Sequence, residues 1–552
     1  MSKKLILFVA LLLCGIPDIV SLSFDFAPFG SELQGRRQGS EFIELSNYAF
    51  AQSVDTAWVR RYNWPGNGYD GAYAIAVDDS GSVYVTGRSA GSGTLDDYAT
   101  IKYYSNGDTA WVRRYDGPGN GPDDAFGIAV DDSGNVYVTG YSYGIGTSDD
   151  YATIKYYPNG DTSWVRRYNG LGNGYDYAYA IAIDASGNVY VTGQSWGGGF
   201  VNDYDYATIK YYSNGDTAWV RRYDGIGNAF DQAFSIAIDS SANVYVTGWS
   251  FGGNEILGDY ATIKYYPNGD TAWVRRYNGT GNGHDLAFGV AVDDSGNVYV
   301  GGYSYESGTH NDYTIIKYYS NGDTAWMRRY NGPGNSSDMA HAIAIDHSGN
   351  VFVTGTATVS FETYDDCATV KYYPNGDTAW VRLYNGPGNA DDYGFAMTVD
   401  DSGIVYVTGY SAQNREAPYN LDYVTIKYNP DGYTSWVIRR YNGPGNGDDY
   451  ARAITVDRSC NVYVTGLSYG GMTGDDYATI KYQYTPFLHG DGNGDGKLTV
   501  SDAIFLINYF FKGGPLSSPL DASDSNCNGQ VSISDVIYLI NYLFKGGPKP
   551  CI

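Results

Sequence analysis

The chain has 552 residues, of which 61 are acidic and 35 are basic, and its formal net charge is −26. This excess of negative charge would repel phosphate groups and argues against nucleic acid as a partner. Charged residues make up 17% and hydrophobic residues 43% of the chain, with 73 glycines and 58 tyrosines. That composition is typical of many short strands joined by turns rather than of a disordered chain. Because the length exceeds one ordinary core, we expect several units or a repeat array.

Residues 1–23 have the pattern of an export signal. Two lysines precede an apolar run over residues 5–13, and small residues follow it. The run is too short for a comfortable membrane span, so we expect cleavage and a secreted or cell-surface protein with no membrane span afterwards. A lipid anchor at Cys14 is the alternative, which the large residue before it disfavours. Residues 24–52 carry no clear signal and are interpreted as a linker.

The sequence TAWVRRY, first present at residues 56–62, recurs with a period of 53 to 56 residues. Its tryptophans are Trp58, Trp111, Trp164, Trp219, Trp273, Trp326, Trp380 and Trp436. Each period also contains runs like AIAVD (74–78), NVYVTG (135–140) and DYATIKYY (97–104), rich in β-branched and aromatic residues and bounded by turn residues. Four strands in each of about eight repeats predict an all-β fold, a β-propeller. A β-solenoid is the alternative, although its periods are usually shorter.

The order of strands within a blade follows from side-chain size. AIAVD alternates small and large residues, which suits the crowded axis, whereas TAWVRRY suits a wide, wet outer rim where arginines pair with acids or lay their stems on apolar surface. The last repeat ends after residues 478–482 without TAWVRRY, and the first TAWVRRY precedes every inner strand. We therefore expect eight four-stranded blades over residues 53–486, with the N-terminal strand closing the ring. A seven-bladed ring would leave one repeat unused.

The repeat GNVYVTGYS…DDYATIKYYPNGDTAWVRRYNG resembles the bacterial SBBP-type β-propeller repeat. The resemblance covers about residues 56–482. It implies an exported propeller and little about activity. The family label suggests seven blades, and the count of eight departs from it.

The two faces of such a ring differ in their loops. The turns DDSGN and SNGDT share one face and scarcely change between repeats, whereas the loop after VYVTG on the other face varies strongly. Variable loops on a rigid scaffold indicate a recognition surface, and their aromatic side chains suit sugars or protein surfaces. Unconstrained drift is the alternative. The candidate ligand-binding residues are Trp196, Phe200, Trp249, Phe251, Phe361 and Tyr419.

The sequence predicts no catalytic residue. Its five histidines are scattered without metal-ligand spacing, and no Gly-x-Ser-x-Gly elbow stands out. Carboxylate pairs such as Asp123 with Asp124 and Asp149 with Asp150 could act on a glycosidic bond. They recur in nearly every blade, however, which favours hydrogen bonding to turn amides.

Two loops near the C-terminus have calcium-loop spacing: DGNGDGKLTVSD (491–502) and DSNCNGQVSISD (524–535). Each has oxygen side chains at positions 1, 3, 5 and 12 and a glycine at position 6, and a similar helix follows each loop. We expect two calcium ions, the second bound more weakly because its loop has one carboxylate fewer. The candidate ligands are Asp491, Asn493, Asp495, the Lys497 carbonyl and Asp502, then Asp524, Asn526, Asn528, the Gln530 carbonyl and Asp535. Cys527 and Cys551 either form a disulfide in this unit or stay as free thiols.

With Asp at position 12 and no helix before the first loop, residues 488–552 resemble a type I dockerin. The resemblance implies calcium-dependent folding and docking onto a cohesin-like module. In that family, loop positions 10 and 11 help to select the partner; here they are Val500, Ser501, Ile533 and Ser534. The near-duplicate halves would allow two binding orientations. The alternative is a calcium-stabilised cap that binds nothing.

The sequence therefore predicts a secreted, non-catalytic binding or scaffolding propeller, tethered to a cohesin-like partner through a calcium-dependent dockerin. Its propeller ligand would be an extracellular glycan or protein. One alternative is a polysaccharide-degrading enzyme, a glycoside hydrolase or lyase of a cellulosome-like assembly. Another is a structural surface protein whose repeats bind nothing small.

Overall fold

The computed structural model describes residues 52–550 except 65–66, 92–94, 200–202, 227–228, 252–256, 361–362, 415–419, 433, 487–489, 494–496, 513–522, 524, 527–530 and 549. The expected signal peptide and all but the last residue of the expected linker lie outside the described residues. The chain divides into two compact units: residues 57–481, and residues 1–56 together with 482–552.

The strands of the larger unit and its closing strand form four-stranded antiparallel sheets, one for each blade. The inner strands are β2 (Asp70–Val77), β6 (Asp123–Val130), β10 (Asp176–Ile183), β14 (Asp231–Ile238), β18 (Asp285–Val292), β22 (Asp338–Ile345), β26 (Asp392–Val399) and β30 (Asp449–Val456). The second strands are β3 (Val83–Ala90), β7 (Val136–Tyr143), β11 (Val189–Trp196), β15 (Val244–Phe251), β19 (Val298–Glu306), β23 (Val351–Ser360), β27 (Val405–Ala412) and β31 (Val462–Tyr469).

The third strands are β4 (Asp96–Tyr103), β8 (Asp149–Tyr156), β12 (Tyr204–Tyr211), β16 (Gly258–Tyr265), β20 (His310–Tyr318), β24 (Thr363–Tyr372), β28 (Leu421–Tyr428) and β32 (Asp475–Pro486). The outer strands are β5 (Thr109–Tyr115), β9 (Thr162–Tyr168), β13 (Thr217–Tyr223), β17 (Thr271–Tyr277), β21 (Thr324–Tyr330), β25 (Thr378–Tyr384), β29 (Thr434–Tyr441) and β1 (Gln52–Tyr62). A short 3₁₀ helix, η1 (Leu171–Asn173), lies between β9 and β10.

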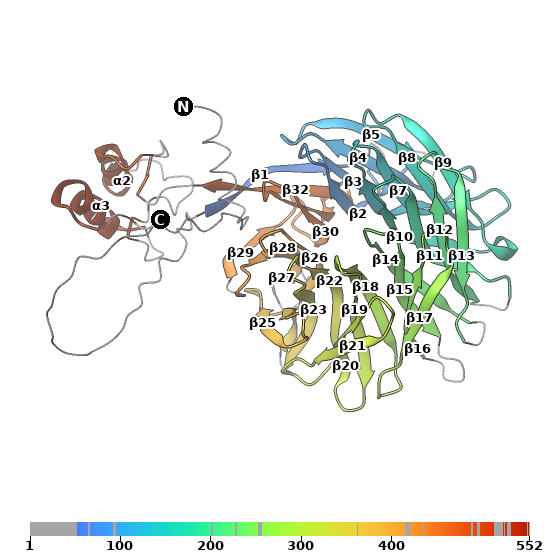
Figure 1. Cartoon of the computed structure of the whole chain (residues 1–552). Helices are drawn as coiled ribbons and strands as arrows, with labels where there is room; N and C mark the ends of the chain where they lie inside the picture. The colour runs from blue at the N-terminus through green and yellow to red at the C-terminus, as the bar shows by residue number, and fades with distance from the viewer. Residues whose placement is uncertain are drawn as a thin grey trace, which may run out of the picture. The chain divides into compact units, whose positions relative to one another are not determined.

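The blades close into a ring. Each inner strand contacts the inner strands of both neighbouring blades, from β2 through β30 and back to β2. Figure 1 shows β1, from the N-terminal end, beside β32, from the C-terminal end of the ring. In the last sheet the order is β1-β32-β31-β30, so the N-terminal strand supplies the missing outer strand. The prediction of an eight-bladed propeller closed by its first strand is confirmed. Blades are numbered 1 to 8 from the sheet of β2 to the sheet of β30.

Where its side chains are described, the repeated TAWVRRY strand fastens its blade to the next. In β5, the Trp111 indole N–H donates to the carbonyl of Pro158 (3.1 Å), which lies in the turn before β9 of blade 2. Arg113 Nε donates to the carbonyl of Gly160 in the same turn (2.6 Å), and its guanidinium lies over the Trp111 ring. Trp111 is only 8% exposed. The expectation of a wet rim is therefore wrong for Trp111, because the turn of the neighbouring blade covers the ring.

The closing strand β1 makes the same contacts with blade 1. Trp58 Nε1 donates to the Ser105 carbonyl (3.2 Å), and Arg60 Nε donates to the Gly107 carbonyl (2.6 Å). The second arginine of the motif pairs with an acid of its own blade, as Arg61 does with Asp476 (2.7 Å), and also donates to the preceding blade, as Arg61 does to the Tyr441 hydroxyl (3.0 Å). The expected pairing of rim arginines with acids is confirmed for this second arginine.

The hydrophobic core lies between neighbouring blades rather than inside each sheet. One cluster combines Tyr84, Tyr98 and Trp111 of blade 1 with Val136 and Ile154 of blade 2. The buried tyrosine hydroxyls find acceptors, as Tyr84 does at Asp78 (2.7 Å). A large amphipathic ring thus fills the space between sheets while its polar end is satisfied.

The C-terminal segment contributes α2 (Val500–Lys512) and α3 (Ile533–Lys545). The two helices contact each other, and Leu506 and Leu539 are fully buried. Ser532 begins α3 with a capping box in which Asp535 is the partner. Among the described residues, no helix has the length and apolar character needed to cross a membrane. Cys527 and Cys551 lie outside the described residues.

Candidate functional site

The predicted calcium loops are partly within the described residues. Asp491, Asn493, Lys497, Asp502, Asn526 and Asp535 are described, whereas Asp495, Asp524, Asn528 and Gln530 are not. The position-12 carboxylates of both loops are fully buried, and Asp491 at position 1 is 4% exposed. Burial raises the pKa of Asp502, and the negative charge of Asp491 adds to the effect.

The two position-12 carboxylates make matching hydrogen bonds. Asp502 accepts from the backbone N–H of Thr499 (2.7 Å) and of Asn493 (3.3 Å). Asp535 accepts from the backbone N–H of Ser532 (2.8 Å) and of Asn526 in the same way (3.1 Å). Each carboxylate therefore joins the start of its helix to position 3 of its loop. A buried set of oxygen donors with crowded negative charge fits a hard cation such as Ca²⁺.

The predicted partner-selecting residues are on the surface of these helices. Val500 is 44% and Ile533 48% exposed, and Ser501 and Ser534 are exposed beside them. The same faces continue with exposed apolar side chains that the sequence reasoning did not single out, in matched pairs 33 residues apart: Ile504 with Ile537 and Phe511 with Phe544. Both halves thus present the same apolar surface.

The variable face of the propeller carries a continuous aromatic run across three blades. Trp196 ends β11 and lies edge-on to Tyr204 of the same blade, with ring centroids 5.3 Å apart. Tyr204 lies 5.3 Å from Phe230 of blade 4, which lies 5.0 Å from Trp249. Trp249 lies 6.1 Å from the exposed His284 of blade 5. We call these five residues the aromatic run.

The structure thus brings two of the six predicted ligand-binding residues, Trp196 and Trp249, into one surface. Phe251 is half-buried at the end of β15, and its carbonyl accepts from Arg276 (2.8 Å). Phe200, Phe361 and Tyr419 lie outside the described residues. The sequence reasoning missed Tyr204, which opens β12 in the same blade as Trp196, and Phe230 and His284, which precede the inner strands of blades 4 and 5.

A β-bulge recurs at one register in the inner strand of all eight blades. The bulged residues are Tyr73, Phe126, Tyr179, Phe234, Phe288, His341, Phe395 and Arg452. From Tyr73 to Phe395, neighbours in this series have ring centroids 5.4 to 6.1 Å apart. Since the inner strands surround the axis, these residues form a collar around it, here called the axial collar. A bulge re-aims a side chain, which explains the alignment.

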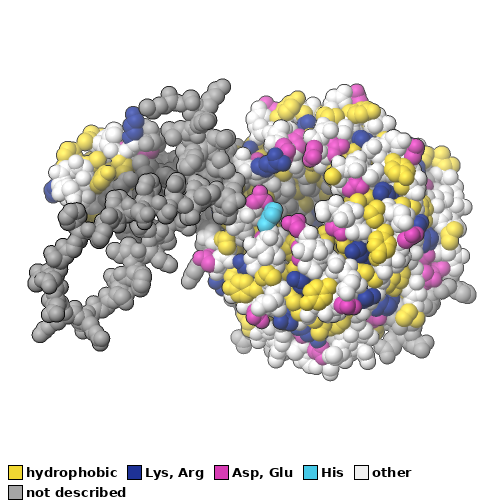
Figure 2. Space-filling model, viewed as in Figure 1, with side chains coloured by type: hydrophobic (Ala, Val, Ile, Leu, Met, Phe, Trp, Pro, Cys, Tyr) yellow, Lys and Arg dark blue, Asp and Glu magenta, His cyan; other side chains and the backbone are white. Residues whose placement is uncertain are grey.

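Six members of the axial collar are tyrosine or phenylalanine, and the other two are His341 and Arg452. The Arg452 guanidinium lies over the Phe395 ring, 4.7 Å from its centroid, and among the described residues its buried Nε has no hydrogen-bond partner. Burial, reinforced by the charge of Arg452, lowers the pKa of His341 to about 4. Beside the collar, a cleft of about 390 Å³ is lined by Tyr450, Tyr469, Asp448, Asp475 and Gly447. The view in Figure 2 shows acidic, basic and hydrophobic side chains interspersed over the visible propeller surface.

The repeated carboxylates are engaged in the fold. Asp123 is fully buried and accepts from the backbone N–H of Gly117 (2.8 Å) and of Tyr143 (3.1 Å). Burial raises its pKa to about 6. Asp150 pairs with Arg167 (2.8 Å). Asp123 thus bonds turn amides, the interpretation favoured from the sequence, whereas Asp150 is held by an arginine.

Two family models match the chain. A beta-propeller repeat model, SBBP, matches residues 111–146, 164–200, 272–308 and 325–362, and a dockerin type I domain model matches residues 489–544. No curated protein sequence matches significantly.

Similar solved structures include a eukaryotic initiation factor (7% identity, 75% of this chain and 88% of that one, TM-score 0.38) and polysaccharide lyase Uly1 (10%, 67% and 92%, 0.40). A glucose dehydrogenase also matches (11% identity, 55% of this chain and 95% of that one, TM-score 0.32). At these scores, the likenesses support no conclusion about fold or activity. The family matches and the observed blades and helices agree: this chain is a protein of SBBP β-propeller repeats with a C-terminal type I dockerin domain.

Proposed function

We propose that the protein is a secreted, non-catalytic binding and scaffolding protein, whose propeller (53–486) binds an extracellular glycan. Its dockerin (488–552), loaded with two calcium ions, would tether it to a cohesin-like module. The aromatic run across blades 3, 4 and 5 is the observation that carries the proposal.

The aromatic run has the chemistry of a sugar platform. Its members combine large flat rings, on which the C–H face of a sugar stacks, with polar edges on Tyr204 and His284 that can bond hydroxyl groups. Trp196 and Trp249 are half-buried, so packing holds their rings in place before a ligand arrives. Contacts with Tyr204 and Phe230 link the two tryptophans, so one extended chain of sugar units would meet successive rings.

Calcium binding by the dockerin is supported by the buried oxygen donors of both loops. Type I dockerin domains typically bind calcium and imply a cohesin partner. The first ion would be held by Asp491, Asn493, Asp495, the Lys497 carbonyl and Asp502. The second would be held by Asp524, Asn526, Asn528, the Gln530 carbonyl and Asp535.

Docking onto the cohesin-like module would use the duplicated helix faces. Val500 with Ser501 and Ile533 with Ser534 occupy the partner-selecting positions. The matched exposed side chains Ile504 and Ile537 would extend each apolar face. Since α2 and α3 present matching apolar faces, either half would suffice for docking.

The glycan proposal is tested with the full chain and neutral oligosaccharides prepared from a panel of plant and bacterial polysaccharides. Calorimetric titration should give saturable binding, and Trp249→Ala should weaken it about tenfold or more, since a stacked anchor is lost. Tyr212→Ala, which removes an exposed aromatic residue from a turn of the uniform face, is the matched control and should bind like the wild type. No binding by the wild type, or equal binding by Trp249→Ala, would contradict the proposal. It would favour a protein ligand or a structural role.

A further inference from the structure

One arginine at the axis of the propeller makes no polar contact with the fold. Arg452 occupies the bulge of β30 and is half-buried. It is the charged member of the axial collar at neutral pH, because burial and the nearby Arg452 lower the pKa of His341 to about 4. Among the arginines whose side chains the structure describes, Arg452 is the one with neither a hydrogen bond nor an ion pair. A half-buried guanidinium without an acceptor indicates a place for an anion.

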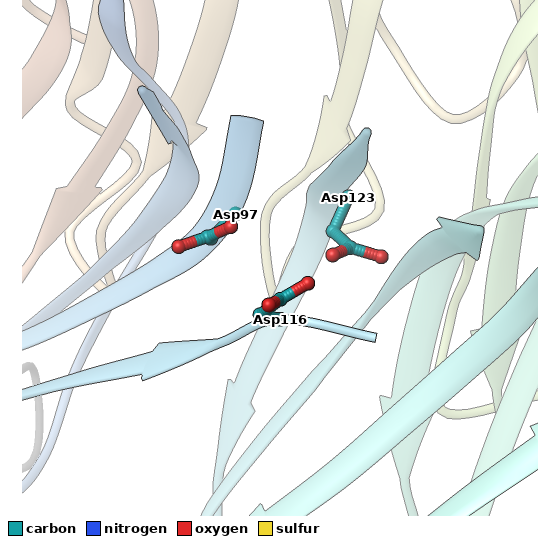
Figure 3. A group of neighbouring side chains, drawn as sticks. All are labelled: Asp97, Asp116 and Asp123. Carbon is teal, nitrogen blue, oxygen red and sulfur yellow. The ribbon is translucent and has the colours of Figure 1, made fainter. Parts of the chain in front are cut away.

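Other charged groups of the propeller are held by partners within the fold. Figure 3 shows Asp97, Asp116 and Asp123 facing one another where blades 1 and 2 meet. Asp97 pairs there with Arg114 (2.7 Å), and Asp123 accepts from two backbone N–H groups. These two buried carboxylates are therefore bound into the blade junction, whereas Arg452 has no such partner among the described residues.

Two aromatic rings hold the Arg452 guanidinium in place. The guanidinium lies over Phe395, 4.7 Å from the ring centroid, and over Tyr450, 5.6 Å from the ring centroid. Stacking uses the flat faces of a guanidinium, whereas its N–H donors lie in its plane and stay available. A planar pair of donors fixed in this way is complementary to a carboxylate, which accepts two parallel hydrogen bonds.

The surroundings of Arg452 favour a carboxylate ligand that also carries hydroxyl groups. The cleft of about 390 Å³ beside the collar is lined by the rings of Tyr450 and Tyr469 and by the carboxyl groups of Asp448 and Asp475. Carboxylate oxygens accept hydrogen bonds from hydroxyl groups, and tyrosine rings offer flat faces to C–H groups. Among carboxylate ligands, a sugar acid has both features.

A row of tyrosines joins the collar to the aromatic run. Tyr175 is 47% exposed and stacks on Tyr177 with ring centroids 6.1 Å apart, and Tyr177 stacks on Tyr179 of the collar at 6.4 Å. The carbonyl of Tyr175 accepts from the backbone N–H of Trp196, a member of the aromatic run (3.2 Å). A glycan seated on the aromatic run would therefore meet a continuous aromatic surface leading to the collar.

We propose that the axial collar binds the uronic acid end of a glycan, with the carboxylate on Arg452 and hydroxyl groups on Asp448 and Asp475. The net charge of −26 would repel a polymer of uronic acids, so the ligand carries a single carboxylate at its end. The inference rests on the proposed function only in taking a glycan as the ligand. It adds a second site, which selects the ligand by charge.

The test is a calorimetric titration of the full chain with two disaccharides, one carrying a single glucuronic acid unit and the other a single galacturonic acid unit. At least one should bind saturably, and its methyl ester, which keeps the sugar body and loses the charge, should bind about tenfold or more weakly. Equal binding of uronate and ester, or binding of neither uronate, overturns the proposal. The neutral oligosaccharides that test the aromatic run carry no carboxylate, so each proposal can fail without the other.

A variant of the collar locates the charge. Arg452→Phe gives blade 8 the residue that four other blades carry at this position, so it is expected to fold. It should bind the uronate about tenfold or more weakly than the wild type. The matched control Arg458→Gln removes an exposed positive charge from a turn of the same blade and should bind like the wild type.

Two results with these proteins overturn the proposal. One is wild-type affinity for the uronate in Arg452→Phe. The other is Arg452-dependent binding of a peptide with a free C-terminal carboxylate in preference to both uronates, which would identify a protein end as the ligand. If Arg452→Phe fails to fold, the comparison of uronate with methyl ester still decides, because it needs no variant.

Discussion

Replacing Trp58 by alanine tests whether the N-terminal strand closes the ring in solution. Trp58 is 7% exposed, its indole N–H donates to Ser105 (3.2 Å), and its ring lies 5.9 Å from Tyr103 and 6.2 Å from Tyr463. Truncating such a buried aromatic residue costs about 3–5 kcal/mol. The free energy of unfolding of the propeller should fall by that amount in urea titrations followed by tryptophan fluorescence.

The ring supplies its own control for this substitution. Trp219 in β13 has the same surroundings: it is 8% exposed, donates to Pro267 (3.1 Å) and lies 6.0 Å from Tyr265. Trp219→Ala should therefore cost as much as Trp58→Ala, to within about 1 kcal/mol. A Trp58→Ala protein as stable as the wild type, beside a strongly destabilised Trp219→Ala protein, would show that β1 does not complete blade 8.

Three further predictions concern the ring and the dockerin. Burial raises the pKa of Asp231 and of Asp338 to about 7, above the value near 3.9 of an unfolded chain, so protonation of these carboxyl groups stabilises the fold. Without calcium, the unfolding temperature should therefore be higher at pH 5 than at pH 8. The opposite order would refute this prediction. Gly87→Ala places a Cβ 1.9 Å from the Gly71 carbonyl oxygen of the neighbouring strand. Chemical unfolding should therefore show a free energy of unfolding lower by about 3 kcal/mol or more. A decrease below about 1 kcal/mol would contradict this close packing. Ile504→Asp should leave docking onto a cohesin-like module nearly intact through the other helix, whereas Ile504→Asp/Ile537→Asp should weaken it roughly a hundredfold in a pull-down titration; equal weakening by both would exclude interchangeable halves.

The fold was predictable because the repeat itself encodes it. Four strand-like runs per period predicted the blade, and the unmatched TAWVRRY at the start and the missing one at the end predicted the closure by β1. What the sequence did not show is why TAWVRRY is so uniform. Trp111 and Arg113 bond carbonyls about 47 residues away in the next blade, a contact that only the closed ring creates.

The candidate sites were predictable where spacing is local and not where blades meet. The candidate ligands of each calcium loop lie within twelve consecutive residues, so their spacing can be recognised in the sequence. The aromatic run escaped notice because Tyr204 and Phe230 belong to different blades. The axial collar depends on a β-bulge in each inner strand, and the alternation of small and large residues in AYAIAV does not reveal that bulge. The change from an aromatic residue to Arg452 looks like drift until the closed ring places it over Phe395 of the neighbouring blade.

The most direct test of the account incubates the full chain with neutral polysaccharides and measures, in one sample, retention on the polymer and the appearance of new sugar ends. A binding protein with the aromatic run as its site predicts retention without release. Release of sugar ends that survives repurification of the protein would contradict the account and identify a polysaccharide-degrading enzyme instead.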